Sequence, residues 1–428
     1  TMKTRSEEGW LIESGPNSAL ETTPLIGEIV GKLGLSSSFL YADENSSKRY
    51  VVRNGTLKQV PTGPLSFLKT DLWSARGKLR LLGEPFIGRG AGEESVAQFV
   101  ARRLGKELLD YGINPFVAGV YAGDPSLLSV RHAFPKLHAL EAKYGGLIKG
   151  MIRSRRERKA RKEVAKDRAR LFSFLDGMQT LPARLSEELG GRIVCGAAAE
   201  SVIPVKTARG PLYTVAFSAG GRRDRAEARA VVLSSPAEAA ALVIERIDPG
   251  TAAALRSISY PPVAEVFLGY DGGQVERGLD GFGFLVPEAE RRKILGTIWS
   301  SSLFPKRAPA GKVALTTFMG GARQPGLTEL GDEELVGIAS GELSRLMEIK
   351  GEPVFSRVIK WKKAIPQYNL GYGKILEKIS RFEDNYRGTF ISSNYRGGIA
   401  VGDCFINSEA VAKRIVEYLS APGQKMHI

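Results

Sequence analysis

Tyr395-Arg396-Gly397-Gly398-Ile399-Ala400-Val401-Gly402-Asp403 is the stretch of this sequence that decides the fold class. The run Thr389-Phe390-Ile391-Ser392 before it has the composition of a buried strand, and the residues from about Asn407 to Leu419 have helical spacing. A strand, a Gly-rich turn and a helix point backbone N–H groups at a ligand, and the paired glycines let the backbone approach a flat ring. The stretch therefore predicts an α/β protein, in which this turn is either a ligand site or a plain buried strand–turn–helix.

The composition places few other limits on the protein. A chain of 428 residues has room for about two or three domains, and 43% hydrophobic and 25% charged residues are ordinary for a globular protein. The sequence has no run of about eighteen apolar residues, so no transmembrane helix is predicted. Cys195 and Cys404 lie far apart without a C-x-x-C pair, and there are 3 histidines. We therefore expect no zinc ribbon, no dithiol motif, no Ser/His/Asp triad and no metal site.

The net charge of +15 is concentrated in one segment. Residues 153–170 contain 10 Lys or Arg and 3 acids, which supplies +7. The pattern predicts a basic helix that continues toward 171–175. A solvated helix face and attachment to anionic phospholipid both explain it, with amphipathic neighbours and 171–175 as the apolar contact. Nucleic acid binding is disfavoured, because the aromatic residues Phe172 and Phe174 follow the run and do not interleave with it.

Local signals predict the other elements. Pro24 begins a helix that stops at Gly34, and Asn54-Gly55 joins two short strands as a hairpin. The pattern is mainly helical from about 61 to 176. It predicts strands over 192–195, 202–206, 213–217, 230–233, 263–270, 313–318 and 354–361, and a helix over 332–347.

Nucleotide-binding signatures are absent from these 428 residues. No G-x-G-x-x-G occurs; Gly88-Arg89-Gly90-Ala91-Gly92-Glu93 has the wrong spacing and no predicted strand before it. No Gly-Lys pair is followed by Ser or Thr, so there is no P-loop. By motif alone, the chain would not be identified as a nucleotide binder.

A second glycine-bracketed stretch, Gly119-Val120-Tyr121-Ala122-Gly123-Asp124-Pro125, makes the pattern specific. Together with residues 395–403 it resembles the protoporphyrinogen and coproporphyrinogen oxidases, FAD-dependent enzymes of the amine oxidase superfamily. The resemblance spans nearly all of the chain. Residues 1–18 resemble the region that follows the Gly-Gly pair in that family, so we expect the chain to begin just after the family's first strand and its Gly-rich FAD loop.

The resemblance implies which residues hold FAD. The N-terminal segment and the C-terminal turn would line the cofactor, Ala199 would hold adenine through its backbone, and Trp361 would lie beside the flavin ring. A plain strand residue at Ala199 and a core aromatic at Trp361 are the alternative interpretations. The implied cofactor-binding residues are Thr1, Gly15, Pro16, Asn17, Ser18, Ala199, Trp361, Asn394, Ile399, Ala400 and Val401.

The resemblance also implies a substrate pocket. Arg49, on a strand that feeds the hairpin, would pair with a propionate, and a guanidinium suits a carboxylate in a poorly hydrated cleft. A solvated strand arginine is the alternative, and Lys48 or Arg53 lies near enough to replace it. Leu285, Ile298 and Phe318 would contact the flat tetrapyrrole, although an ordinary core residue is the alternative for any one of them. The catalytic position would be the backbone carbonyl of Gly119, close to the reacting carbon.

These expectations define an α/β fold with three parts. The first is a Rossmann-like FAD domain built from discontinuous segments (1–27, 172–255 and 385–428). The others are a mixed-sheet substrate domain (28–60 and 256–384) and a helical membrane-associated region (61–171).

The predicted function is oxygen-dependent oxidation of protoporphyrinogen IX, or of coproporphyrinogen III, in haem or chlorophyll synthesis. The expected partners are the porphyrinogen, O₂ and an anionic membrane surface, without nucleic acid and with a homodimer left open. The expected location is cytoplasmic, on the inner face of a bacterial cell membrane; a plastid or mitochondrial membrane remains an option. The alternatives are a carotenoid desaturase-like or amine oxidase-like flavoenzyme, and a non-catalytic, truncated basic membrane-binding protein.

Overall fold

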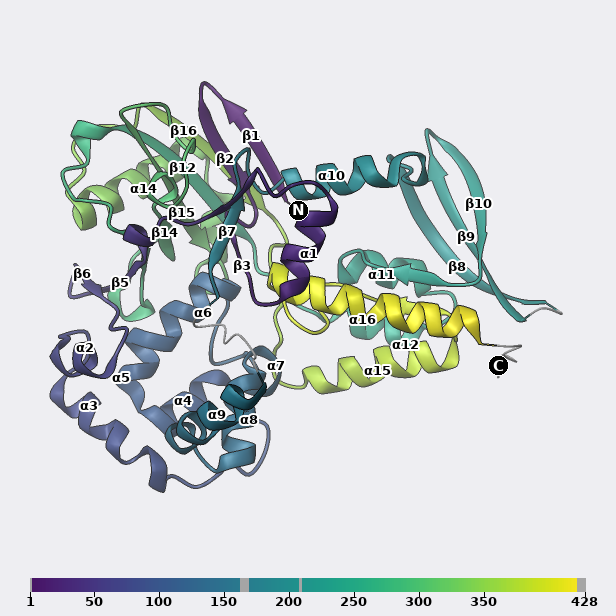
Figure 1. Ribbon diagram of the computed structural model, residues 1–428, viewed down its shortest axis with the longest axis horizontal. Coiled ribbons are helices and arrows are strands. Elements are labelled where there is room, and N and C mark those ends of the chain that lie inside the picture. The colour runs from purple at the N-terminus through teal and green to yellow at the C-terminus, as the bar shows by residue number, and fades with distance from the viewer. Residues whose placement is uncertain (1, 162–168, 208–209, 422–428) are drawn as a thin grey trace. The chain divides into compact units, whose positions relative to one another are not determined.

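The structure is a computed structural model that describes residues 2–161, 169–207 and 210–421 (Figure 1). It divides into two compact units. Unit 1 comprises Thr1–Glu21, Val30–Ala183 and Tyr260–Leu370, and unit 2 comprises Thr22–Ile29, Arg184–Ser259 and Gly371–Ile428. Both units are therefore assembled from distant parts of the sequence. The division into three functional parts stays a prediction.

A seven-stranded mixed sheet organises unit 1. Its strand order is β16-β12-β15-β14-β13-β5-β6. The β13–β5 pair is parallel and the other pairs are antiparallel. The strands are β5 (Lys48–Arg53), β6 (Thr56–Gln59), β12 (Val263–Asp271), β13 (Gly281–Leu285), β14 (Gly296–Ile298), β15 (Lys312–Gly320) and β16 (Phe355–Trp361).

The two faces of this sheet have different roles. Because side chains alternate along a strand, Ala264, Val266 and Leu268 face one side while Glu265 and Phe267 face the other. The first face forms a hydrophobic core, in which helix α14 (Asp332–Met347) covers the sheet beside β12 and β16 (Figure 1). We call the opposite face, which carries Glu265, the site face.

The predicted hairpin is confirmed at the edge of the sheet. Asn54 (φ 51°) and Gly55 (φ 72°) are both left-handed, as a two-residue turn between twisted strands requires. The predicted helix α14 is confirmed at Asp332–Met347, and α1 spans Pro24–Lys32 with left-handed Gly34 (φ 69°) beyond its end. The predicted strands at 263–270, 313–318 and 354–361 correspond to β12, β15 and β16.

One prediction in unit 1 is wrong. Residues 171–174 form strand β7 (Leu171–Phe174), not the end of a helix, and Phe172 and Phe174 are fully buried. β7 lies between β3 (Ala19–Leu20) and β4 (Phe39–Tyr41), where Phe39 stacks on Phe172. Alternating aromatic residues favour a strand, and the adjacent charge run hid that alternation. This segment therefore supplies no apolar membrane contact.

The remaining strands of unit 1 form a hairpin, β1 (Lys3–Glu7) and β2 (Trp10–Ser14). Helices follow one another from α2 to α9, as predicted. They are α2 (Pro64–Lys69), α3 (Ala75–Leu82), α4 (Val96–Leu104), α5 (Lys106–Leu108), α6 (Asn114–Tyr121), α7 (Val130–Ala133), α8 (Pro135–Tyr144) and α9 (Leu147–Arg161), with α13 (Ser300–Leu303) in the sheet region. The basic run enters α9, and residues 162–168 lie outside the described part of the chain.

A buried ion pair joins these helices. Arg103 and Glu84 are both fully buried, 3.1 Å apart, and Glu141 also contacts Arg103. The Glu84 carboxylate accepts the N–H groups of Leu147 (2.7 Å) and Ile148 (3.1 Å) at the start of α9. A carboxylate at that end of a helix satisfies unpaired donors and complements the dipole, so Glu84 fixes where α9 begins.

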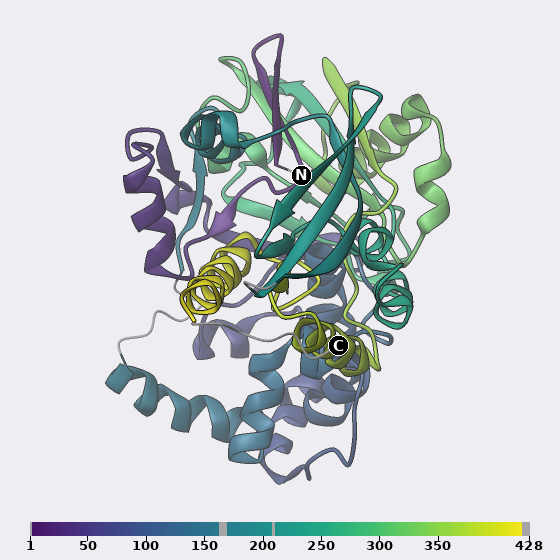
Figure 2. The same cartoon turned by 90° about the vertical axis from the view of Figure 1, so that its right-hand side faces the viewer.

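Unit 2 combines an antiparallel three-stranded sheet with helices. The sheet, visible in teal in Figure 2, has the order β10-β9-β8, and β11 pairs in parallel with β17. The elements are β8 (Ala197–Thr207), β9 (Gly210–Ala219), β10 (Arg222–Ala228), β11 (Val231–Leu233), β17 (Thr389–Ile391), α11 (Ala237–Ile244), α12 (Pro249–Arg256), α15 (Tyr372–Asn385) and α16 (Val401–Ser420); α10 (Thr180–Leu189) crosses the boundary between units.

Two boundaries in unit 2 differ from prediction. Residues 193–195 lie between a 3-10 turn (Gly190–Arg192) and β8, so the strand predicted over 192–195 is wrong. Cys195 is exposed there, and both cysteines are free. Helix α16 begins at Val401, immediately after the Gly turn, and not at about Asn407. In the described part of the chain, no helix is both long enough and apolar enough to span a bilayer.

Candidate functional site

The site face gathers the residues predicted to bind substrate. Strand pairing aligns Arg49 with Gly283, Gly283 with Ile298, Leu285 with Gly296, and Gly296 with Phe318. Directly paired residues project to the same side of a sheet, so the four side chains share the site face on four adjacent strands. Leu285, Ile298 and Phe318 are each half-buried, and Arg49 is exposed. They form an apolar floor with a cation at one edge.

Gly119 lies against this floor. A Cβ atom at Gly119 of α6 would be 2.4 Å from Cδ2 of Leu285, closer than side chains normally pack. The end of the helix is held as well, because Ala122 accepts the N–H of Ala322 (2.7 Å) and Tyr121 accepts the amide of Gln367 (2.8 Å). A glycine at this position therefore lets α6 approach β13 directly.

The three candidate cations differ in their surroundings. Lys48 pairs with Asp280 (2.5 Å), and Arg53 pairs with Glu107 (2.7 Å). The Arg49 guanidinium instead lies exposed, 6.0 Å from the ring centroid of Phe282. Arg49 is consequently better placed than Lys48 or Arg53 to receive an external carboxylate.

The predicted flavin residues of unit 1 meet at a glutamate that the sequence reasoning missed. Glu265 Oε1 accepts the indole N–H of Trp361 (2.8 Å) and the backbone N–H of Gly15 (3.2 Å). Gly15 has φ 108°, which favours glycine, and begins the turn through Ser18. The signal in the sequence was a lone acid at position 265 within the apolar run 263–270.

The C-terminal turn of unit 2 is held in shape by a buried carboxylate. Glu383 of α15 accepts the backbone N–H of Ile391 (2.7 Å) and pairs with Arg396 (2.5 Å) and Arg414 (2.7 Å). The Glu383 side chain of α15 therefore connects the turn with β17 and α16. Asn394, Ile399 and Val401 are half-buried and Ala400 is exposed along this turn.

The same turn tests whether the residues fit a flavin. Gly397 (φ 89°) and Gly398 (φ 130°) have conformations that favour glycine, and a Cβ on Gly398 would lie 2.4 Å from Asp403. Ala400 is the N-cap of the 20-residue α16 and makes no side-chain capping hydrogen bond. A glycine cradle at the positive end of a long helix suits an electron-rich ring edge, so these residues fit the group.

Two other positions are predicted to contact the cofactor, Ala199 and Thr1. Ala199 is exposed on β8, and the pairing with β9 shifts register between Ala199 and Ser201. Such an irregularity leaves backbone groups unpaired, which favours a ligand held by main-chain atoms. Thr1 lies outside the described residues. The assignment of all these residues to FAD stays a prediction.

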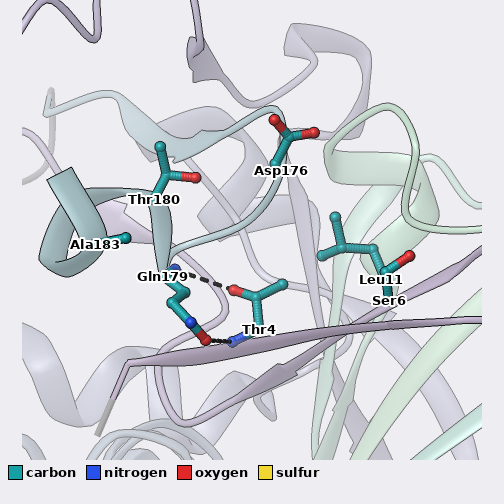
Figure 3. A pocket seen from close by; sticks show the side chains of 7 residues that line it. All are labelled: Thr4, Ser6, Leu11, Asp176, Gln179, Thr180 and Ala183. Carbon is teal, nitrogen blue, oxygen red and sulfur yellow. Dashed lines mark hydrogen bonds between the residues drawn. The ribbon is translucent and has the colours of Figure 1, made fainter.

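A shallow pocket of unit 1 lies elsewhere (Figure 3). Thr4 and Gln179 bridge it with two reciprocal hydrogen bonds of 2.9 and 3.0 Å. None of the predicted site residues lines it; its lining is Thr4, Ser6, Leu11, Asp176, Gln179, Thr180 and Ala183. Because none of the predicted site residues lines it, we do not assign the chemistry to this pocket.

Comparison with known proteins identifies the family. Residues 1–416 match the model of the flavin-containing amine oxidoreductases. The chain therefore belongs to that family of flavin-dependent oxidoreductases. Protoporphyrinogen oxidase 2 of Arabidopsis thaliana is 31% identical over 97% of this chain and 86% of its own length. Coproporphyrinogen III oxidase of Bacillus subtilis is 26% identical over 98% and 89%.

A solved structure supports the fold. A protein from Exiguobacterium sp. 255-15, provisionally identified as a protoporphyrinogen oxidase, has a TM-score of 0.77 at 19% identity, over 98% of this chain and 90% of that chain. The mixed α/β fold with a large mixed sheet is therefore shared with a solved relative. The predicted resemblance to this family is confirmed.

Proposed function

We propose that this protein uses FAD to oxidise a porphyrinogen, protoporphyrinogen IX or coproporphyrinogen III, to the porphyrin, with O₂ as final electron acceptor. The observation that carries the proposal is the site face, where Arg49, Leu285, Ile298 and Phe318 align on adjacent strands beneath Gly119. The names of the two relatives support the same substrate class.

The side chains of the site face divide the work of binding. The ring of Phe318 and the aliphatic groups of Leu285 and Ile298 would contact the faces of a flat macrocycle and exclude water from it. Arg49 would form charge-assisted hydrogen bonds to a propionate and set the orientation in the plane. Gly119, without a side chain, would let the reacting carbon approach the backbone carbonyl.

In unit 1, Gly15–Ser18 and Trp361 would contact the flavin. In unit 2, the turn 394–401 would also contact FAD, and Ala199 would hold adenine through its backbone. A bound flavin would accept a hydride from the substrate carbon. The protein's own contribution is orientation, since no acid–base pair is assigned and the pyrrole protons would leave to solvent.

Arg49→Ala tests this assignment. Losing one charge-assisted contact at an exposed site costs about 1.5 kcal/mol, so we expect kcat/KM for the porphyrinogen to fall about tenfold with an unchanged flavin spectrum. Lys48→Ala, which removes the neighbouring cation from the opposite face, is the control and is expected to have little effect. An unchanged KM in Arg49→Ala would discard Arg49 as the propionate anchor.

Parallel assays with the two porphyrinogens, read by porphyrin fluorescence, would identify the preferred substrate. A colourless purified protein would contradict the flavoenzyme and support the non-catalytic alternative. The desaturase-like alternative is less favoured, because both relatives oxidise porphyrinogens by name.

We also propose peripheral attachment to an anionic membrane through the helices that follow β6. Large apolar side chains are exposed there: Leu65 (75%), Leu68 (66%), Leu79 (64%), Leu82 (70%) and Phe86 (89%). On α9, Met151 and Ile152 are exposed beside the cations Lys149 and Arg153. Exposed apolar groups with nearby cations are the features of an interfacial membrane contact.

Co-sedimentation with phosphatidylserine vesicles tests this proposal. We expect Leu79→Ser/Leu82→Ser to lower vesicle binding about tenfold or more, because two apolar anchors are lost. Leu242→Ser, at an exposed leucine (57%) of unit 2, is the matched control. Unchanged vesicle binding together with a loss of dimer in sedimentation would assign the patch to self-association instead.

A further inference from the structure

Glu265 is a buried acid on the site face, on the strand next to the edge strand β16. It is 4% exposed and pairs on β12 with Phe318 of β15 on one side and Ile359 of β16 on the other. An ionised carboxylate among such neighbours is costly unless it is paired with a cation. A buried acid retained here therefore requires an explanation.

The two carboxyl oxygens of Glu265 differ. Oε1 accepts both described hydrogen bonds, from Trp361 and from Gly15. Oε2 is buried and has no hydrogen-bond partner among the described residues. One oxygen thus joins two segments that are 346 residues apart and that are both predicted to contact the flavin, while the other has no described cation or donor to support a negative charge.

The charged groups near Glu265 do not compensate it. Glu13 of β2 adds a second acid, and the nearby Arg307 lies 3.9 Å from Glu13. Arg357, on the same face of β16, pairs with Glu7 of β1. Burial raises the pKa of Glu265 to about 8; the hydrogen bonds from Trp361 and Gly15 lower it, and Glu13 raises it further. The surroundings therefore favour the neutral acid around neutral pH.

We propose that Glu265 is a positioning residue for the flavin: as a neutral acid it holds Gly15 and Trp361 in one arrangement, and on ionisation its buried, unpartnered Oε2 disturbs that arrangement. The proposal rests on the flavin site proposed above. Because Glu265 Oε2 is buried, Glu265 acts through Trp361 and Gly15 and not by direct contact. An ionised group in this place must recruit water or move, and either change disturbs the packing beneath Trp361.

Titration of the flavin-free protein with FAD, followed by visible absorbance, tests the proposal. Between about pH 7 and about pH 9.5 we expect the Kd of the natural protein to rise about tenfold, because the water or movement that the ionised Oε2 requires disturbs the packing beneath Trp361. Glu265→Gln keeps an acceptor oxygen but cannot ionise, so its Kd is expected to be nearly independent of pH. Glu265→Ala is expected to bind about tenfold more weakly already at about pH 7.

A second variant keeps the test decisive if Glu265→Gln does not fold. Trp361→Phe retains a ring but removes the N–H donor, which favours the ionised acid, so the midpoint of the pH transition is expected to move upward. An identical midpoint in natural protein, Glu265→Gln and Trp361→Phe would overturn the proposal. Failure of the natural protein to bind FAD at any pH would instead overturn the proposed function.

Discussion

Glu265→Gln is expected to make the folded protein more stable at alkaline pH. The folded pKa of Glu265 is about 8, raised above its ordinary value of 4.5 chiefly by burial. Between these values the unfolded chain releases a proton that the folded chain keeps, so the free energy of unfolding falls as the pH rises. The stabilising contribution is complete below about pH 4.5 and is lost by about pH 8.

The size of the effect follows from the same values. The two pKa values differ by about 3.5. Since one pKa unit corresponds to about 1.36 kcal/mol, this difference corresponds to about 5 kcal/mol. Water that enters beside the ionised group reduces this, and we expect between about 2 and about 5 kcal/mol. At about pH 5 the variant is expected to be about 1 kcal/mol less stable, because its buried NH₂ group gains an unpaired donor. The two stability curves therefore cross.

Urea unfolding followed by circular dichroism at a series of pH values measures the difference between the two proteins. Glu329→Gln, at an exposed acid of the same unit, is the control and is expected to run parallel to the natural protein. Parallel curves for Glu265→Gln would refute the reasoning, since they would mean that Glu265 ionises in the folded protein as it does in the unfolded chain.

Three further substitutions probe the site. Gly119→Ala places a Cβ 2.4 Å from Leu285, so kcat/KM is expected to fall about tenfold with flavin binding retained, and Leu285→Ala is expected to restore part of the loss; no change would remove Gly119 from the pocket. Gly398→Ala combines φ 130° with a 2.4 Å approach to Asp403, so FAD affinity in an absorbance titration is expected to fall at least about tenfold; normal affinity would argue against the cradle. Glu383→Gln removes the partner of Arg396 and Arg414, and we expect the free energy of unfolding to fall by about 2 kcal/mol; an unchanged urea midpoint would contradict that role.

Local chemistry made parts of the fold predictable from the sequence. Asn54-Gly55 can form a tight left-handed turn without neighbours, and the helix at Asp332–Met347 has its own periodicity, so both were located correctly. Strand β7 was missed because a run of charges preceded it and its partners β3 and β4 lie more than 100 residues away in the sequence. Tertiary pairing decided that segment.

The candidate site was likewise predictable only in part from the sequence. The pattern of glycines and the resemblance indicated Arg49, Gly119, Leu285 and Phe318. The strand register then placed Arg49, Leu285 and Phe318 on one face of the sheet, and Gly119 of α6 lies against Leu285. Glu265 could not be identified in this way, because its importance lies in contacts with Gly15 and Trp361 that only the folded chain creates.

The parallel pairing of β5 with β13 has a consequence for how the protein is made. β5 leaves the ribosome some 230 residues before β13, and its hairpin with β6 can form at once, while its inner edge must wait for Gly281–Leu285. During this interval Tyr50 and Val52, which are buried in the core of the folded protein, remain exposed to water. Such distant pairing makes folding slow and leaves an unpaired edge open to aggregation, so a chaperone requirement during synthesis would originate at this strand.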